Sequence, residues 1–399
     1  MKIRIGVIFG GESVEHEVSI ITAIQAMNKM DTEKYEIIPI YISKKGEWYT
    51  GNHLRDMETY QDLNLLKRYA HNVVLYHKKG NFILQSKGFL KRFITDIDIA
   101  FPIVHGTNVE DGVLQGYLHS IGIPFVGSDV YASVVGQDKV FMKQIFESNK
   151  LPITKYVWFF DNEYKEDSKA IINKTTKLKY PLIIKPASLG SSVGINIAND
   201  HQELINAIEE AINYDHKIIV EEVVHNLKEV NISVLGDYEH QEVSAIEEVT
   251  TANALLTYED KYIGNKNGKG GTISKGSSSL RKIPAQLDDK LQQKIEITAK
   301  SAFKALNSSG VVRLDYLIDS KEAKIYINEI NNIPGSLSFY LWEKAGKKYS
   351  ELLDDLINIG IKDYKKRNSK THSFDSNILQ NYNGSKGGKF LKGGIKGKL

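Results

Sequence analysis

The sequence predicts an α/β protein made of three successive blocks, the first of which holds a mainly parallel sheet. In that block, β-branched runs at 3–9, 35–42 and 97–104 alternate with segments of helical periodicity at 18–27 and 113–119. Strands that alternate with helices in this way favour parallel pairing. A chain of 399 residues is also longer than one hydrophobic core usually organises, which indicates two or three domains.

The two later blocks contain shorter expected strands with helices between them. The pattern changes near Asp138, where Asp138-Lys139-Val140-Phe141-Met142-Lys143 starts a helix. The expected strands lie at 154–159, 181–185, 195–197, 217–221, 230–235, 311–318 and 323–328, and a last helix lies at 349–359. The expected domains are 1–135, 136–222 and 223–363, followed by a tail at 364–399.

One segment of the first domain has a different composition. Residues 45–95 are rich in Lys, Tyr and Asn. We expect this segment to be an insertion on the first sheet rather than part of its core.

The overall composition is that of a soluble globular protein, with 41% hydrophobic and 25% charged residues. No apolar run approaches the roughly 18–20 residues that a membrane-spanning helix needs. The chain starts directly with an expected strand, so we expect no signal peptide. The absence of cysteine excludes disulfides, thiolate nucleophiles and cysteine-bound zinc. These features predict a cytoplasmic protein without a membrane partner.

The carboxyl-terminal tail at 364–399 is strongly basic, with nine Lys or Arg and one acid. Its last sixteen residues contain six glycines, five lysines and no acid, too little apolar surface to order a chain. Contact with nucleic acid or another anionic surface is one interpretation. We favour a solvated, disordered tail without a nucleic-acid function, because the acidic body shows no aromatic-interleaved basic face.

A loop of small residues led by a lysine is a candidate for binding phosphate. The expected strand at 181–185 ends at Lys185 and runs into Gly190-Ser191-Ser192-Val193-Gly194, which places a cation beside free backbone N–H groups. The loop is neither a Walker loop nor a dinucleotide fingerprint. A tight structural turn explains it equally well when it is taken alone. Lys139 upstream and Glu221 downstream favour the phosphate interpretation.

Two pairs of polar residues on neighbouring expected strands predict a site for a hard cation. Arg313 and Asp315 are two residues apart in one strand and therefore share a face, and Glu329 and Asn331 are likewise two apart. Their oxygens suit Mg²⁺ that bridges phosphates, or Mn²⁺ in its place. Surface salt bridges would explain the charges, but not the Asn-Asn-Ile-Pro-Gly turn that follows at once.

A carboxylate at the start of the first expected helix is a candidate for binding a small cationic group. A Gly10-Gly11 turn ends the first strand, and Glu15-His16-Glu17-Val18-Ser19 begins the helix. A carboxylate that only interacts with the helix N-terminus is the plainer alternative. The phosphate and Mg²⁺ motifs elsewhere in the chain favour a substrate site.

Together these motifs resemble the ATP-grasp ligases and, within them, the D-alanine–D-alanine ligase family. Residues 9–19 match the first family signature almost residue for residue. The run His105-Gly106-Thr107-Asn108-Val109-Glu110-Asp111-Gly112 resembles the second, although Val109 replaces a usual glycine. The resemblance covers about residues 3–360. It implies an ATP-grasp architecture, in which an N-terminal substrate-binding domain precedes two α+β subdomains that clamp ATP.

The resemblance also implies roles for individual residues. Those implied to bind ATP are Lys139, Lys185, Lys261, Glu221, Val224 and Glu229. Those implied to bind Mg²⁺, expected as two ions, are Asp315, Glu329 and Asn331. Those implied to act on the first D-alanine or on the tetrahedral intermediate are Glu15, Ser191, Tyr262, Arg313 and the Gly335 N–H.

A mobile lid is implied at 258–280, since the family closes a loop there over ATP and keeps water from the acyl phosphate. Its residues 264–279 are too rich in Gly, Lys and Ser to be core, and a plain linker is the alternative. Tyr262 resembles the tyrosine of the members that use D-alanine.

The acceptor site departs from the family pattern. The family has a Ser-x-Ser pattern after Pro-Gly, and its second serine falls on Tyr340 when the sequences are aligned without gaps. We expect Ser338, Tyr340 and Leu341 to line the acceptor subsite.

The expected activity is therefore ATP-dependent ligation of two D-alanines through an acyl phosphate, with release of ADP, for peptidoglycan synthesis. One alternative is a ligase of the same fold with D-serine, D-lactate or another amino acid as acceptor. A more distant alternative is a non-catalytic nucleotide-binding protein. A homodimer is implied by family analogy alone.

Overall fold

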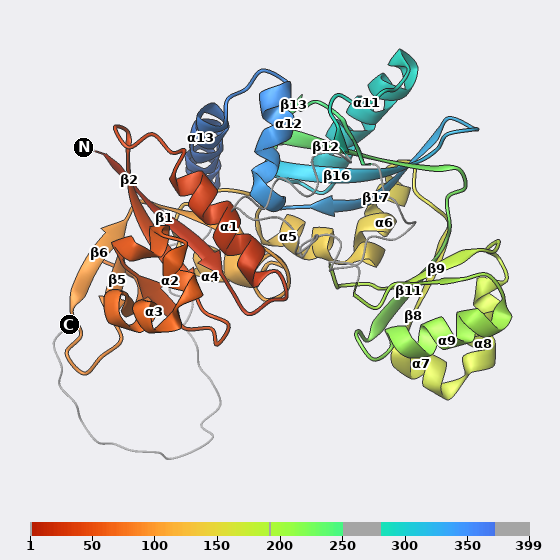
Figure 1. The fold of residues 1–399 in the computed structure, drawn as a ribbon, viewed down its shortest axis with the longest axis horizontal. Helices are drawn as coiled ribbons and strands as arrows, with labels where there is room; N and C mark the ends of the chain where they lie inside the picture. The colour runs from red at the N-terminus through yellow and green to blue at the C-terminus, as the bar shows by residue number, and fades with distance from the viewer. Residues whose placement is uncertain (1, 191–192, 250–280, 372–399) are drawn as a thin grey trace, which may run out of the picture.

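The computed structural model describes residues 2–190, 193–249 and 281–371, which form three sheets with helices around them (Figure 1). The sheets have seven, four and six strands and follow one another along the chain. Within the described residues no helix is both long and apolar enough to cross a bilayer. Several predictions concern residues outside the described ranges, namely Ser191, the lid with Lys261 and Tyr262, and the tail beyond residue 371.

The first sheet has the strand order β6-β5-β4-β3-β2-β1-β7. Its elements are β1 (Ile3–Gly10), α1 (His16–Met27), β2 (Tyr35–Ile42), β3 (Trp48–Thr50), η1 (Asn52–Arg55), α2 (Glu58–Gln61), α3 (Leu63–Tyr69), β4 (His71–Lys78), β5 (Asn81–Ser86), β6 (Phe93–Ile97), β7 (Ile99–Val104), α4 (Val113–Ile121) and α5 (Val130–Gln137). Parallel pairing is confined to β2-β1-β7, and the other pairs are antiparallel. Short connections such as the two-residue turn between β4 and β5 permit only antiparallel neighbours.

The prediction that residues 45–95 lie outside the core of this sheet is wrong. The segment supplies β3 to β6, and Leu54, Leu66, Val73 and Leu84 belong to the same buried cluster as β1. In β4, buried residues alternate with exposed ones. The polar, outward-facing residues of these strands dominate the composition of the segment. The composition therefore does not reveal that the alternate residues face the core.

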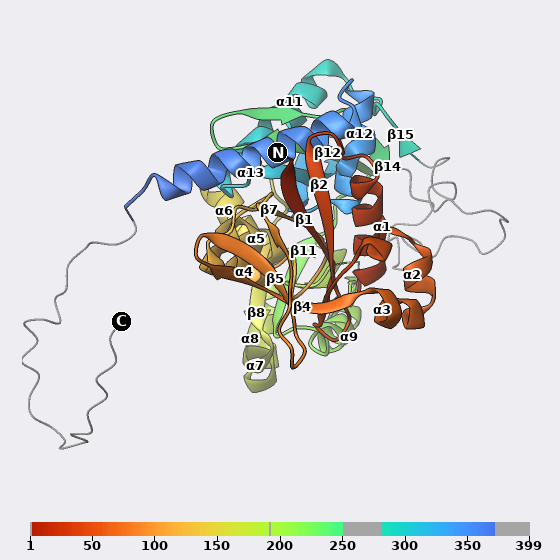
Figure 2. The same ribbon diagram turned by 90° about the vertical axis from the view of Figure 1, so that its left-hand side faces the viewer.

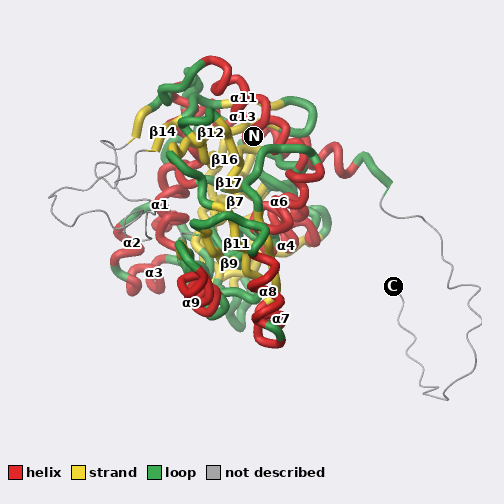
Figure 3. Tube along the Cα trace, turned by 90° about the vertical axis from the view of Figure 1, so that its right-hand side faces the viewer, coloured by secondary structure: helices red, strands yellow, loops and turns green. Residues whose placement is uncertain are grey.

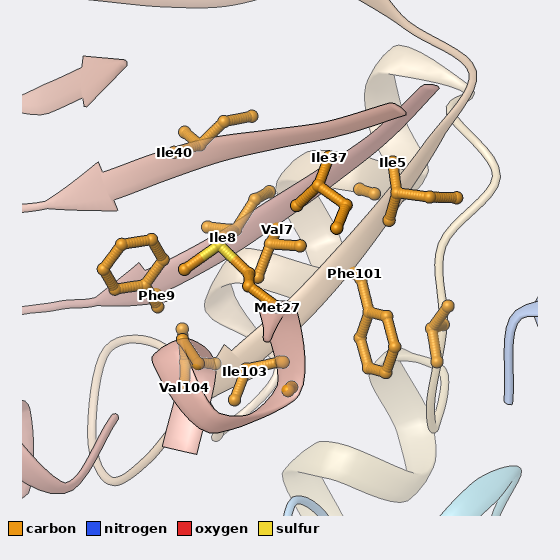
Figure 4. Packing of buried hydrophobic residues seen from close by; sticks show 14 of the residues in the cluster. Ile5, Val7, Ile8, Phe9, Met27, Ile37, Ile40, Phe101, Ile103 and Val104 are labelled. Atoms are coloured by element: carbon orange, nitrogen blue, oxygen red, sulfur yellow. The ribbon is translucent and has the colours of Figure 1, made fainter. Parts of the chain in front are cut away.

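The centre of the first block is a continuous apolar layer (Figure 4). Ile5, Val7, Ile8 and Phe9 of β1 are all fully buried, as expected for a central parallel strand covered on both faces. Helix α13 (Tyr349–Asn368), which runs past this sheet in Figure 2, adds Leu352, Leu353, Leu356 and Ile357 to the same cluster. The last helix of the chain therefore ties the third block to the first.

The middle sheet is antiparallel, with the order β10-β9-β11-β8. Its strands are β8 (Tyr156–Phe160), β9 (Leu182–Pro186), β10 (Asn196–Ala198) and β11 (Lys217–Glu222). The helices α7 (Asp161–Glu166), α8 (Ser168–Thr175) and α9 (His201–Ala211) gather beside it in Figures 1 and 3. This block has a core of its own.

The third sheet is also antiparallel, with the order β15-β14-β12-β16-β17 and β13 paired to β12. Its elements are β12 (Leu227–Gly236), β13 (Gln241–Val243), β14 (Glu247–Val249), β15 (Arg281–Lys282), α11 (Asp289–Ala305), β16 (Gly310–Asp319), β17 (Lys324–Asn331), η2 (Gly335–Ser338) and α12 (Phe339–Lys344). Helix α6 (Lys139–Ser148) contributes Met142 and Phe146 to this core, although the sequence predicts it in the middle domain.

Helix α13 is longer than predicted and includes the first residues of the expected tail. It continues to Asn368, five residues past the predicted boundary at 363. Lys362 Nζ lies 2.6 Å from Asp237 Oδ2, and Lys366 Nζ lies 2.7 Å from Glu239 Oε2. These ion pairs hold the last turns of the helix against the β12–β13 turn, so the basic residues there are structural.

Candidate active site

Two strands of the third sheet bring the predicted cation-binding residues together. In the β16–β17 register Arg313 lies opposite Asn331, and Asp315 lies opposite Glu329. Arg313 donates from Nε to Asp315 Oδ1 at 2.7 Å and from Nη2 to Oδ2 at 2.8 Å. Asn331 Nδ2 donates to Asp315 Oδ2 at 3.3 Å. The predicted sharing of one face is therefore confirmed.

A β-bulge in β17 turns Glu329 to this face. Asp315 pairs with Glu329, but the next residue of β16, Tyr316, pairs with Ile327, so Asn328 is an extra residue on β17. By strict alternation Glu329 would share the side of Ile327, which is fully buried in the core. The extra residue shifts the pattern, and Glu329 instead faces the same side as Asp315.

The polar row continues across the sheet to residues that the sequence analysis missed. Asn231 of β12 lies opposite Asp315, and Glu247 of β14 lies opposite Asn231. Glu247 is fully buried, and its Oε2 accepts a hydrogen bond from Tyr340 Oη at 3.3 Å. Burial lowers the pKa of Arg313, but the Asp315 carboxylate outweighs it and holds the pKa well above its usual value. The guanidinium therefore stays charged in a row of acidic neighbours.

A buried ion-pair network surrounds Glu221. Glu221 Oε2 lies 2.9 Å from Lys143 Nζ and accepts from Thr154 Oγ1 at 2.6 Å, while Oε1 lies 3.2 Å from Lys185 Nζ. Burial alone would raise the pKa of Glu221, but Lys143 and Lys185 lower it to about 2. Lys185 Nζ also donates to Asn328 Oδ1 at 3.1 Å, which links the middle sheet to the bulge in β17.

Lys143 is a residue of this network that the sequence analysis did not select. It is fully buried and lies four residues after Lys139 on α6, hence on the same face of the helix. This four-residue spacing from Lys139 is visible in the sequence and could have identified Lys143. Lys139 Nζ donates to the carbonyl oxygen of Leu189 at 2.6 Å, so it reaches the predicted phosphate loop. Burial lowers the pKa of Lys139, and the nearby Glu329 opposes that shift.

The predicted substrate carboxylate lies between two glycine loops. A side chain placed on Gly106 would lie 3.2 Å from Glu15 Oε2, and one placed on Gly190 would lie 3.7 Å from it. Glu15 precedes α1 but makes no side-chain capping hydrogen bond there. Glu15 nevertheless occupies the N-cap position of α1, as the plainer interpretation expects, and its carboxylate also lies close to the two glycines. The first block and the phosphate loop meet at this carboxylate.

Glu110 joins the first block to the turn that follows β17. Its Oε2 accepts from Gly106 N at 3.0 Å, and its Oε1 accepts from Ile333 N at 2.9 Å. Burial raises the pKa of Glu110 to about 8, and the nearby Glu15 adds to the shift. The sequence analysis quoted Glu110 within a motif without giving it a role. The structure makes it a buried connection between two loops of the site.

Val109, which stands next to Glu110 where the family usually has glycine, is accommodated by the fold. Val109 is buried and packs on Gly11, where an added side chain would lie 2.7 Å from Val109 Cγ1. The positive φ values of this loop fall on Gly106, Asn108 and Gly112, at 84°, 66° and 95°, and not on Val109. A glycine is therefore not required at position 109 for this backbone.

The remaining predicted residues lie in different surroundings. Val224 follows β11 and is buried, and Glu229 lies on β12. Ser338 and Leu341 are fully buried, whereas Tyr340 is half-buried and reaches Glu247. Of the three expected acceptor residues, Tyr340 alone is seen to reach the polar row. The roles of Ser191, Lys261 and Tyr262 stay predictions, because these residues lie outside the described ranges.

Two antiparallel sheets that meet through Lys185 and Asn328, with carboxylates and lysines at the junction, define a ligase of the ATP-grasp class. The family model described as D-ala D-ala ligase N-terminus matches residues 4–128, and that described as D-ala D-ala ligase C-terminus matches residues 145–358. The chain belongs to the D-alanine–D-alanine ligase family.

Individual relatives agree with this assignment. A D-alanine–D-alanine ligase of Thermosipho melanesiensis is 40% identical over 378 residues, which cover 95% of this chain and 98% of the relative. The solved D-alanine-D-alanine ligase of Coxiella burnetii superposes with a TM-score of 0.76 at 26% identity, over 92% of this chain and 96% of that one. VanG D-Ala:D-Ser ligase from Enterococcus faecalis superposes with a TM-score of 0.75 at 31% identity, over 90% of this chain and 100% of that one.

We predict that Glu110→Gln lowers the free energy of unfolding by about 1–3 kcal/mol, because both oxygens of a carboxyl group can accept a hydrogen bond whether or not it is protonated, whereas the amide nitrogen cannot accept from the second backbone donor. Asp111→Asn is the matched control, since Asp111 also accepts from two backbone N–H groups but is partly exposed. Chemical denaturation of both variants measures the difference. Equal losses in the two variants would contradict the assigned role.

The raised pKa of Glu110 also predicts a pH dependence. The folded protein holds a proton on Glu110 up to about pH 8, whereas the unfolded chain releases it near 4.5. The native state therefore binds more protons in this window, and the free energy of unfolding falls as the pH rises through it. Glu110→Gln should flatten that slope in denaturation curves taken across the window.

We predict that Lys143→Met lowers the free energy of unfolding by about 3 kcal/mol or more, because it removes one cation from a buried carboxylate. Lys165→Met, which breaks an exposed ion pair with Asp161, should change stability little. Adding Glu221→Leu to Lys143→Met should recover part of the loss. Urea titrations of the four proteins measure this, and an unchanged midpoint for Lys143→Met would contradict the network.

Proposed function

We propose that this protein ligates two D-alanines to D-alanyl-D-alanine, with ATP as the energy source and ADP as a product. The observation that carries the proposal is that Glu15 lies beside Gly190 of the phosphate loop, while Glu110 is near enough to both Glu15 and Arg313 for each of them to shift its pKa. The near-full-length match to relatives named D-alanine–D-alanine ligase supports the same activity. Peptidoglycan synthesis in the cytoplasm is the role that follows.

The donor half of the site is built to hold an amino acid by its ammonium group. Glu15 presents a carboxylate oxygen close to Gly106 and Gly190, and a side chain at position 106 would crowd that oxygen at 3.2 Å. Ser13 Oγ donates to His105 O at 2.6 Å and accepts from Glu15 N at 3.2 Å, which fixes the start of α1 against the second loop. A D-alanine held by Glu15 would direct its carboxylate toward Lys139 and Lys185, which are expected to bind the phosphates of ATP.

ATP would transfer its terminal phosphoryl group to the donor carboxylate, giving an acyl phosphate and ADP. The amine of the second D-alanine then attacks the acyl carbon, and phosphate leaves as the tetrahedral intermediate collapses. The chain supplies positioning and charge for these steps and no covalent nucleophile. Lys139 and Lys185 would bind the phosphates, and Glu221, Val224 and Glu229 would line the adenosine pocket.

The polar row on β16 and β17 fits Mg²⁺, expected as two ions. Asp315, Glu329 and Asn331 offer hard oxygens on one face. No group of three or more acidic, His or Cys side chains within the described ranges is arranged to hold a metal by itself, so phosphate oxygens of ATP would complete the coordination. When bound there, Mg²⁺ would offset the negative charge of the transferred phosphoryl group. Asp315 is already oriented by Arg313 and Asn331.

The oxyanion of the tetrahedral intermediate would be stabilised by Arg313 and by the backbone N–H of Gly335. The turn that carries Gly335 is held on both sides. Ile333 N donates to Glu110, and Ser336 N donates to Thr22 Oγ1 at 3.1 Å. A backbone N–H that is fixed in this way before the reaction does not have to reorganise as negative charge develops on the oxyanion.

A second candidate function is ligation of D-alanine to a different acceptor. Tyr340 takes the position of the serine expected to bind the acceptor carboxylate, and the structural neighbour named VanG is a D-Ala:D-Ser ligase. The hydrogen bond between Tyr340 and Glu247 places a polar group beside this subsite. We favour D-alanine as acceptor because the relatives that match nearly the whole chain carry that name. A homodimer remains part of the proposal by family analogy.

We predict that Glu329→Gln abolishes D-alanine-dependent ADP release, because it removes one of two carboxylates expected to bind the cation. Glu322→Gln is the matched control, since Glu322 is exposed and pairs with Lys324 on the same hairpin. Coupled-enzyme assays measure ADP, and denaturation checks that both variants fold. Near-normal turnover by Glu329→Gln would contradict the metal assignment.

We predict that Tyr340→Phe raises the KM for the second amino acid by about tenfold and leaves the KM for ATP nearly unchanged, since one hydrogen bond at the acceptor side is lost. Tyr131→Phe is the control, because Tyr131 is exposed on α5. Initial rates with each substrate varied in turn measure the effect. Equal changes in both constants would argue against an acceptor role.

A further inference from the structure

The loop between β5 and β6 exposes an unusual set of side chains. All seven residues from position 87 to 93 are exposed. Phe89 is 102% exposed, Leu90 66% and Phe93 62%. The remaining side chains of the run are Lys87, Lys91 and Arg92, with Gly88 between. We call residues 87–93 the basic-aromatic loop.

The base of this loop is fixed by hydrogen bonds, so its apolar side chains are held away from the core. Ser86 Oγ accepts from Arg92 N at 2.9 Å and donates to Leu90 O at 3.2 Å. Ser86 N donates to Arg92 O at 2.9 Å, and Lys87 N donates to Asn72 O at 2.9 Å. A closed loop whose tip is Phe89 and Leu90 exposes apolar surface that a soluble protein usually buries.

The charge of the loop is uniformly positive. Lys87, Lys91 and Arg92 form no ion pair with any carboxylate that the structure describes, and no acidic residue lies between positions 87 and 93. At the end of α3, three residues before Asn72 in the chain, the exposed Tyr69 ring has Arg68 5.3 Å from its centre. The loop therefore interleaves basic and aromatic residues, a local feature that the sequence analysis did not recognise.

We propose that the basic-aromatic loop binds the surface of a membrane that contains anionic lipids. Phe89, Leu90 and Phe93 would enter the boundary between headgroups and acyl chains, while the three cations contact the headgroup phosphates. A second copy of the chain fits the loop poorly, because a two-fold contact would bring the cations of both copies together. An anionic membrane surface offers apolar chains to the tip of the loop and negatively charged headgroups to the cations on either side of it.

The position of the loop suits this partner. It leads into the edge strand β6, on the side of the first block that faces away from the four-stranded sheet (Figure 1). Lys185 belongs to that four-stranded sheet. Binding through the loop would therefore hold the enzyme at a surface and leave its candidate active site accessible to soluble substrates.

The test is binding of the full chain to vesicles made of equal parts phosphatidylcholine and phosphatidylglycerol, compared with phosphatidylcholine alone. Co-sedimentation should show binding to the anionic vesicles that weakens with added salt. Phe89→Ser with Leu90→Ser, and separately Lys91→Glu with Arg92→Glu, should each lower the partition coefficient at least about tenfold. Unchanged thermal melting and ADP release would show that both variants fold.

The matched control changes an exposed apolar residue and a nearby lysine elsewhere. Ile297→Ser with Lys294→Glu alters α11, where Ile297 is 65% exposed, and should leave vesicle binding unchanged. Binding that both loop variants retain would assign it to the lysines of residues 386–398 and overturn the proposal. No binding by the unmodified chain would overturn it too, as would loop variants that change only its self-association.

Discussion

One extra residue in β17 sets the geometry of the candidate active site. Asn328 is inserted between Ile327, which faces the core, and Glu329, which faces the site. Without that bulge Glu329 would lie on the apolar side, where an ionised carboxylate is costly to bury. The same extra residue supplies the amide that Lys185 contacts from the neighbouring sheet. The bulge thus places Glu329, an expected cation ligand, on the face of Asp315, and it connects two sheets.

Buried polar groups join the blocks around the site, although Glu221 and Lys185 both lie on the middle sheet. Glu221 of the middle sheet binds Lys143 of α6 and Lys185 of β9, and Glu110 of the first block accepts from the turn after β17. Such groups contribute less to net stability than apolar side chains would, since their desolvation offsets most of the gain. They do specify how the blocks meet. Glu110 connects the first block to the turn after β17, and Lys185 connects the middle sheet to Asn328 of β17.

Many of the strands and part of the candidate active site could be predicted from local sequence patterns. The β-branched runs became β1, β2, β8, β9 and β16 within a few residues, and the two-residue spacing of Arg313 and Asp315 placed them on one face. Patterns of this kind act within one strand or one helix, so a single sequence contains them. The departure at Val109 left the fold intact because the positive φ falls on its neighbour.

Other features depend on the register between distant segments, which local patterns do not contain. Glu247 and Asn231 join the polar row because β14 and β12 pair beside β16. The strands between positions 45 and 95 looked like an insertion because half of their residues face water. The bulge at Asn328 reverses the alternation that the sequence would suggest for Glu329. In each case the place of the residues depends on the strand with which they pair.

The most direct measurement is ADP release by the purified protein with ATP and Mg²⁺, across D-alanine, L-alanine, D-serine and D-lactate, with products identified by mass spectrometry. The structure leads us to expect D-alanine-dependent ADP and D-alanyl-D-alanine as the product. D-alanine-dependent ADP with only a mixed product would keep the donor site and move the acceptor to another molecule. Absence of turnover with every one of these substrates would contradict the assignment of the site to this ligation.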